Sequence, residues 1–272
     1  MLKLMKYEIR SVWWIYLTSG VLILAMSGIS RLIYQLMPTD PEKLAWSILT
    51  YSAFTGLTVF FIIAAFVLAN AVPAVRFYQT VLKDQGYLTF TLPVKRASVY
   101  FSKLFTGALG LVFTALFAVG GIFIAFAGTK IGSGAVKILD GIRESFSVID
   151  LSELVTGGQI TVFVITALLM VLHFLFGTTS VLFCSMCIGQ LASGNKLLYS
   201  ILSFVGINTA TSPISSFFSL ISQALFIDGI SDNTAMWALV LSSFLSVLPS
   251  VLITAGCIVA SNLILKKHLN LE

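Results

Sequence analysis

The chain has 272 residues, of which 58% are hydrophobic and 10% are charged, and its formal net charge is +5. A soluble domain has about 25% charged residues, because polar side chains must cover its surface, so this composition excludes an ordinary soluble fold. The charged residues are clustered, and they leave six long charge-free windows along the chain.

Each window is long enough for a helix that crosses a membrane, since about 20 apolar residues span the hydrocarbon core. The short alternating strands of a membrane barrel are absent from the pattern, and helices then satisfy the backbone hydrogen bonds in lipid. We therefore predict an all-α polytopic membrane protein with a single transmembrane domain over residues 1–272. Its six transmembrane helices are predicted at residues 13–37, 46–75, 101–127, 160–191, 197–224 and 236–265.

The N-terminal residues 1–12 have the pattern of an amphipathic helix. The apolar face is formed by Leu2, Met5, Ile9 and Val12, and the basic face by Lys3, Lys6 and Arg10. Such a helix can lie in the headgroup plane before the chain turns into the first span. The alternative is that these residues are the ordinary basic flank of the first span, and the periodicity does not decide between the two.

The stretch between the second and third spans, residues 76–103, reads RFYQTVLKDQGYLTFTLPVKRASVYFSK. It is too long for a simple hairpin and too apolar for a solvated linker. Residues 76–85 can form a short helix that ends at Gly86 in a left-handed conformation, and Pro93 separates the extended run 87–92 from the third span. Exposed apolar residues bordered by charge usually mark a partner surface, so we predict that this stretch binds a partner.

Two polar residues within predicted spans are candidates for a cargo path. His173 lies well inside the fourth span, where an ionisable residue indicates a function, although a structural hydrogen bond to a neighbouring helix would also explain it. Asn208 lies in the fifth span close to Pro213, which removes a backbone donor and predicts a kink or a break. The residues that follow, 214–227, are then either re-entrant or the outer half of the span.

Cys184 and Cys187 form a C-x-x-C pair in the fourth span, a spacing that redox and metal sites both use. Both thiols lie in an apolar helix without a second pair or a nearby histidine in the sequence, so we interpret them as small packing residues and predict no metal site. No constellation of catalytic residues is visible within the spans, and enzymatic activity is not expected.

The distribution of charge predicts the orientation of the chain. Residues 1–12, 76–103, 192–196 and 266–272 hold eleven basic and three acidic residues, whereas the rest of the chain holds five basic and eight acidic residues. Basic residues favour the cytoplasmic side, so we expect a protein of the cytoplasmic membrane with both chain ends in the cytoplasm and the loop 128–159 outside the cell. The basic excess then reflects topology and attraction to membrane lipid, and it gives no case for binding nucleic acid.

The opening MLKLMKYEIR, followed by a Trp-flanked span, and the run RFYQTVLKDQGYLTFTLPVKRASVYFSKL after the second span resemble permease subunits of ABC-2-type ABC transporters from Gram-positive bacteria. The resemblance is strongest in residues 1–12 and 76–104, and the rest of the six-span layout matches in hydropathy. It implies an N-terminal elbow helix, a coupling helix in residues 76–92 and an exporter of amphipathic cargo, such as a peptide, an antibiotic or a lipid-like molecule.

The resemblance also implies two kinds of partner, an ABC ATPase subunit and a second permease subunit that is identical or paralogous. The chain has no Walker A pattern, because the glycine nearest to a lysine, Gly194, gives GNKL rather than GK[ST]. ATP would therefore be bound by the partner, and this chain is expected to bind no cofactor. The residues expected to contact the ATPase are Phe77, Val81, Leu82, Lys83, Asp84, Gly86, Tyr87 and Phe90.

Two other function classes remain open at this point. An ion-coupled or proton-coupled secondary transporter usually has more charge within the membrane and internal repeats, and the sequence has neither pattern. A non-transporting membrane scaffold or sensor is the other alternative. Association with an ATPase separates the exporter from both.

Overall fold

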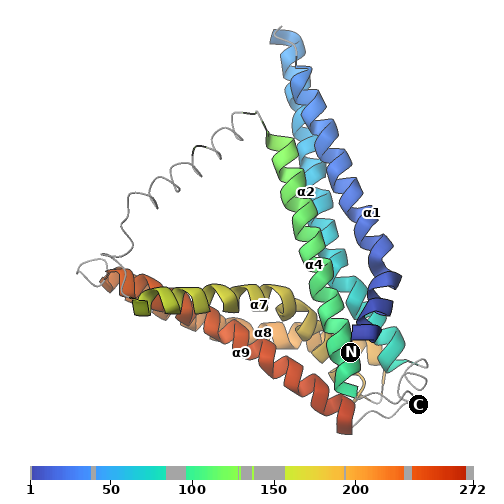
Figure 1. Ribbon diagram of the computed structural model, residues 1–272, viewed down its shortest axis with the longest axis vertical. Helices are drawn as coiled ribbons and strands as arrows, with labels where there is room; N and C mark the ends of the chain where they lie inside the picture. Colours follow the sequence, from blue (N-terminus) through green and yellow to red (C-terminus); the bar gives the residue numbers. More distant parts are fainter. Residues whose placement is uncertain are drawn as a thin grey trace. The chain divides into compact units, whose positions relative to one another are not determined.

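The computed structural model describes residues 2–37, 41–83, 96–127, 129, 137, 157–192, 194–229 and 235–267. Within these residues the regular structure is helical, with no strand (Figure 1). The long helices are α1 (Leu2–Gln35), α2 (Pro41–Phe77), α4 (Arg96–Phe126), α7 (Gly157–Gly189), α8 (Lys196–Gly229) and α9 (Ala235–Lys267). A short π-helix, η1 (Tyr78–Leu82), directly follows α2.

All six long helices are long and apolar enough to cross a membrane. This confirms the predicted fold class, an all-α polytopic membrane protein with six transmembrane helices. The helices begin or end beyond several of the predicted spans, since helical backbone continues past the stretch that is apolar enough to lie in lipid.

The helices expose apolar side chains and bury small polar ones, which is the pattern expected in lipid. Phe60, Leu116 and Phe123 are each more than 60% exposed, and in hydrocarbon this exposure is favourable. Ser27 and Ser261 are fully buried, and each donates its hydroxyl hydrogen to a carbonyl of its own helix at 2.7 Å. Small residues whose hydroxyls are satisfied in this way allow two helix backbones to approach closely.

The chain divides into two compact units, and the first comprises Lys6–Ala71 and Leu109–Asp150. Here the helices α1 and α4 pack through small residues, and a Cβ atom added at Gly121 would lie 2.6 Å from Cγ2 of Ile23. Trp13 and Phe113 meet edge to face, with ring centroids 5.0 Å apart. The close approach at Gly121 thus requires glycine, as in other helix pairs within membranes.

The second unit comprises Met1–Met5, Val72–Ala108 and Leu151–Glu272. It contains α7, α8 and α9, which all pack against one another (Figure 1), together with η1, the last residues of α2 and the first part of α4. The grooves and the buried cluster described below all lie within this unit.

The helix α1 runs from Leu2 to Gln35 without a break, so a separate interfacial helix over residues 1–12 is not seen. The reason lies in the sequence, because no glycine or proline occurs before Gly20 to end the helix. The continuous helix agrees with the alternative in which the N-terminal residues are the basic flank of the first span.

The helix α8 continues through Pro213 to Gly229. Of the two predicted alternatives, a kink or a break, the break is therefore wrong, and the residues after the proline continue the same helix. Transmembrane helices tolerate proline because neighbouring polar side chains can bond to the backbone. Near this proline, Asn208 Nδ2 donates to the carbonyl of Phe204 at 2.7 Å and Thr211 Oγ1 to that of Ile207 at 2.8 Å.

Candidate functional site

Three aromatic side chains, named here the aromatic cluster, join helix ends in the second unit. Phe77 at the end of α2 stacks on Phe183 of α7, with ring centroids 4.2 Å apart and ring planes 10° apart. Tyr100, near the start of α4, meets Phe77 and Phe183 edge-on at 6.0 and 5.7 Å. All three side chains are fully buried. The buried residues packed around them are Ala74, Val81, Leu82, Val99, Leu104, Cys187 and Leu265.

The aromatic cluster and its neighbours include residues on both sides of the segment 84–95, which itself lies outside the described residues. Leu82, two positions before the segment, is buried in the cluster, and so is Val99, which closely follows it. At the start of α4, Arg96 Nη1 donates to the carbonyl of Leu265 in α9 at 2.7 Å. The residues that flank the segment thus pack together with residues of α2, α4, α7 and α9.

The structure corrects the expected exposure of three residues in the predicted partner surface. Phe77, Val81 and Leu82 are 0%, 1% and 7% exposed, because helical backbone continues past α2 and turns them into the core of the chain itself. Lys83 is exposed. The other four predicted contact residues, Asp84, Gly86, Tyr87 and Phe90, lie outside the described residues.

The π-helix η1 replaces the new helix that was predicted over residues 76–85. Its wider turn is closed by a hydrogen bond from Lys83 N to Tyr78 O at 3.0 Å, and such π-helical turns are frequent at functional sites. The Lys83 ammonium lies 5.7 Å from the centroid of the Tyr78 ring. The end of α2 thus presents a cation and an aromatic ring side by side.

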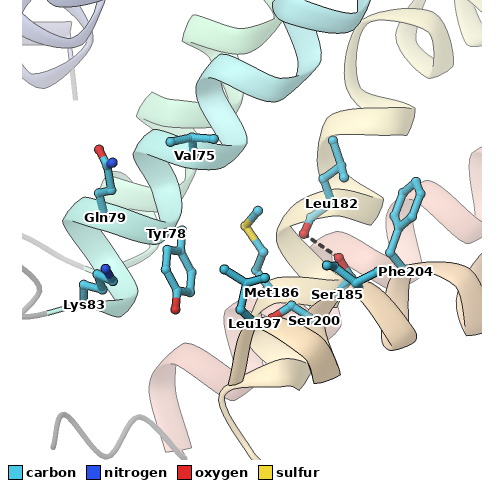
Figure 2. A pocket seen from close by; sticks show the side chains of 11 residues that line it. Val75, Tyr78, Gln79, Lys83, Leu182, Ser185, Met186, Leu197, Ser200 and Phe204 are labelled. Carbon is cyan, nitrogen blue, oxygen red and sulfur yellow. Dashed lines mark hydrogen bonds between the residues drawn. The ribbon is translucent and has the colours of Figure 1, made fainter. Parts of the chain in front are cut away.

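A groove of about 460 Å³, named here the amphipathic groove, lies between the end of α2 with η1 and the helices α7 and α8 (Figure 2). Figure 2 shows Lys83, Gln79 and Tyr78 on one side, with Met186 and Leu197 across from Tyr78. Its apolar lining residues are Val75, Leu182, Met186, Leu197, Ile201 and Phe204, and its polar ones are Tyr78, Gln79, Lys83, Ser185 and Ser200. The groove is thus mainly apolar, and Lys83 is the one cation among the described residues that line it.

A second cleft, of about 220 Å³, lies between α7, α8 and α9 and is named here the polar cleft. Both candidate cargo-path residues, His173 from α7 and Asn208 from α8, line it. The other lining residues are Gly177, Thr178, Val181, Phe204, Thr211, Ser215, Ser250, Ile253 and Thr254. The sequence analysis identified each residue independently as a candidate for a cargo path. In the structure both residues line the same cleft.

His173 has a defined orientation in the polar cleft. Its Nδ1 atom lies 2.9 Å from Thr254 Oγ1, and Thr254 Oγ1 also lies 2.8 Å from the carbonyl of Ser250. Because a hydroxyl has one hydrogen and Thr254 donates it to this carbonyl, Nδ1 of His173 is the donor to Thr254, and Nε2 of the neutral ring is an acceptor. This hydrogen bond supports the structural interpretation of His173. The imidazole ring nevertheless lines the polar cleft.

Gly177, one helical turn from His173, makes room for the imidazole ring. A Cβ atom added at Gly177 would lie 2.7 Å from Cε1 and 2.8 Å from Nδ1 of His173. Any larger residue at Gly177 would therefore displace the ring. Sequence reasoning missed this residue, although a glycine four positions after an ionisable residue on one helix face is a signal that can be found.

The amphipathic groove and the polar cleft follow one another along α7 and α8, and Phe204 lines both. On α7 the lining residues run from Met186 in the groove to His173 in the cleft. At about 1.5 Å per residue this distance is roughly 20 Å, about two thirds of the hydrocarbon core. The two hollows thus follow one another along α7 and α8 and share Phe204 as a lining residue.

Cys184, Cys187 and Cys257 are free and buried, and Cys187 belongs to the packing around the aromatic cluster. Within the described residues no group of histidine, cysteine and acidic residues is placed to hold a metal ion.

No family model, curated protein or solved structure matches this chain. The resemblance to ABC-2 permeases therefore stays a prediction from the sequence.

Proposed function

We propose that this chain is the membrane-spanning permease subunit of a bacterial ATP-driven ABC exporter, which moves an amphipathic cargo across the cytoplasmic membrane. One observation carries the proposal. Leu82 and Val99, on either side of the segment 84–95, are buried around the aromatic cluster, and Lys83, the last described residue before the segment, lines the amphipathic groove. This arrangement suits a membrane subunit on which a partner protein exerts force. The force would change the shape of the groove through which cargo passes.

The sequence supports this assignment independently. The segment lies within residues 76–104, where the resemblance to ABC-2 permeases is strongest, and the resemblance implies a coupling contact there. The chain has no Walker A pattern, so ATP would be bound and hydrolysed by a separate ATPase subunit. A second permease subunit, identical or paralogous, would complete the transporter.

The expected orientation agrees with the contacts within the second unit. Lys83, Arg96 and Lys266 lie at the end of η1, the start of α4 and the end of α9, and these helix ends meet around the aromatic cluster. Because basic residues favour the cytoplasmic side, this end of the unit would face the cytoplasm with both chain termini. The segment 84–95 would then be accessible to a cytoplasmic ATPase.

The proposed mechanism is mechanical. When ATP closes the two ATPase subunits, they push on the segment through Lys83, Asp84, Gly86, Tyr87 and Phe90. The stacked pair Phe77 and Phe183 passes the displacement to α7. A small movement of a packed helix is sufficient to change a neighbouring groove, because close-packed side chains shift between discrete arrangements.

The lining of the two hollows suits an amphipathic cargo. The apolar side chains of the amphipathic groove, such as Leu182, Met186 and Ile201, would take up the apolar part. Lys83 would attract an acidic group, and the hydroxyl and amide groups of the polar cleft would accept or donate hydrogen bonds. His173 and Asn208 would contact the cargo in the polar cleft, deeper in the membrane than the amphipathic groove.

One observation favours a second candidate, a proton-coupled secondary transporter. His173 is an ionisable residue in a polar cleft between three membrane-crossing helices, and such residues can carry protons in transporters. That function would need no ATPase partner, so partner binding discriminates between the two.

The experiment is to purify the tagged chain from its host in mild detergent and to identify the proteins that co-purify. We expect an ABC ATPase, and we expect the double substitution Tyr87→Asp and Phe90→Asp to release it. The control is Tyr7→Asp, which introduces one negative charge in place of an aromatic residue that is 71% exposed and outside the segment. Isolation of the chain alone, without an ATPase, contradicts the proposal.

A further inference from the structure

A groove of about 670 Å³ lies between the start of α4 and the end of α9, apart from the proposed cargo route. Two cations, Arg96 and Lys266, line it together with four larger apolar residues, Phe101, Ile258, Val259 and Leu263. No acidic residue is among the described residues that line it. Basic pockets between membrane-crossing helices bind lipid headgroups when apolar walls accompany the charge. We propose that this groove binds one anionic phospholipid.

The two cations are placed to hold a phosphate group. Arg96 is the first residue of α4 and Lys266 lies one residue before the end of α9, so both are at helix ends, where headgroups lie. Arg96 Nη1 donates to the carbonyls of Leu265 and Lys266 at 2.7 and 3.4 Å, which fixes the guanidinium at the end of α9. A phosphate bound in the groove would accept charge-assisted hydrogen bonds from these cations.

The apolar walls favour a lipid over a soluble phosphate as the occupant. Val259 and Leu263, one turn apart on α9, are 57% and 49% exposed, and they face the groove with Phe101 of α4. From Lys266 to Val259 the helix extends roughly 10 Å, so an acyl chain would pass from the cations into the hydrocarbon. A soluble phosphate would gain nothing from these walls, whereas a lipid buries its chain against them.

Asn262 adds a polar group between the cations and the apolar walls. One hydrogen of its amide is donated to the carbonyl of Ile258 at 2.9 Å, and the amide has a second hydrogen and an oxygen. An ester carbonyl of a phospholipid lies at a comparable depth below the phosphate. Along α9, Lys266, Asn262 and Val259 therefore follow the order of phosphate, ester and acyl chain in a phospholipid, with Leu263 next to Asn262.

This site does not depend on the transport function. It would connect α4 to α9 at the end of the segment 84–95, so lipid composition would affect the stability of that junction whatever the cargo or energy source is.

The test is native mass spectrometry of the purified, delipidated chain with phosphatidylglycerol or phosphatidylcholine that carry the same acyl chains. We expect preferential retention of phosphatidylglycerol by the wild type. Lys266→Gln should reduce this retention about fivefold, since a basic residue near a membrane surface contributes about 1 kcal/mol toward an anionic lipid. The control Lys196→Gln, a cation at the start of α8 that does not line the groove, should leave it unchanged.

Two further measurements keep the outcome decisive. Ala97 is an exposed residue that lines the groove, so Ala97→Phe should fill it and abolish retention of the lipid while the helical circular dichroism stays that of the wild type. Glycerol 3-phosphate in excess should not displace the lipid, because it lacks the acyl chains. Equal retention of the two phospholipids, wild-type retention by Lys266→Gln, or displacement by glycerol 3-phosphate would overturn the proposal.

Discussion

Phe77 at the end of α2 and Phe183 on α7 stack face to face, with ring centroids 4.2 Å apart. This contact connects the residues before the segment 84–95 to a helix that lines both the amphipathic groove and the polar cleft. Both rings are fully buried, so neither can move away without leaving a cavity. The pair therefore connects the end of α2 to α7, in addition to the direct contribution of Lys83 to the lining of the groove.

The first prediction concerns this stacked pair. Phe183→Ala should lower the free energy of unfolding in detergent by about 3 kcal/mol, because truncation of a buried phenylalanine leaves a cavity. The same variant should lose the dependence of ATPase activity on cargo. Thermal unfolding monitored by tryptophan fluorescence measures the first effect, and Phe163→Ala is the matched control, because Phe163 lies on the same helix and is 60% exposed. Equal unfolding midpoints of the two variants would contradict the packing role.

The second prediction concerns the room that Gly177 leaves for His173. Gly177→Ala should displace the imidazole and break its 2.9 Å contact with Thr254, which should lower both thermal stability and transport. An interhelical hydrogen bond in a membrane contributes about 0.6 kcal/mol, so the loss of stability should be small but measurable. Gly256→Ala is the control, since a Cβ atom there meets nothing within 4 Å. If the two alanine variants behaved alike, Gly177 would have no special role.

The third prediction places a constriction at Phe204, which lines both hollows. In a cysteine-free background, a cysteine at position 208 should react faster with a small thiol reagent from the groove side when Phe204 is replaced by alanine, and slower when it is replaced by tryptophan. Reaction rates in inverted membrane vesicles measure the effect. Phe217→Ala, at a residue of α8 that is 60% exposed, should not change the rate. Rates that do not follow the size of residue 204 would argue against a continuous route.

Hydropathy was sufficient to predict the six helices, because a helix that crosses lipid needs a long apolar stretch whatever its neighbours are. It was less informative about helix ends. The first span was predicted at residues 13–37, whereas α1 begins at Leu2, since polar residues outside the lipid can remain helical. Of the kink or break expected at Pro213, the break is wrong, because α8 continues through this residue, as transmembrane helices can at proline.

The sequence predicted part of the candidate site. His173 and Asn208 were found one by one, because a polar residue in a membrane-crossing helix is conspicuous, but their shared cleft depends on which helices pack together. The burial of Phe77, Val81 and Leu82 was missed for the same reason. Their apolar character indicated that these side chains are buried. The structure shows that Phe77 is buried against Phe183 and its neighbours in the same chain.

The fourth prediction concerns topology. Single cysteines placed at positions 83 and 133 of a cysteine-free chain should differ in whole cells, since the basic ends of the second unit are expected in the cytoplasm. An impermeant thiol reagent should label position 133 and not position 83, and permeabilised cells should allow labelling at both. Labelling at position 83 in intact cells would reverse the proposed orientation.

The most direct test of the central claim is reconstitution of the purified transporter into liposomes, with accumulation of a fluorescent amphiphile as the measured quantity. The account predicts accumulation that requires ATP on the side of Lys83 and Arg96, that persists when an ionophore removes the proton gradient, and that is lost with Tyr87→Asp and Phe90→Asp. Accumulation driven by a proton gradient without ATP would contradict it and would favour the secondary transporter.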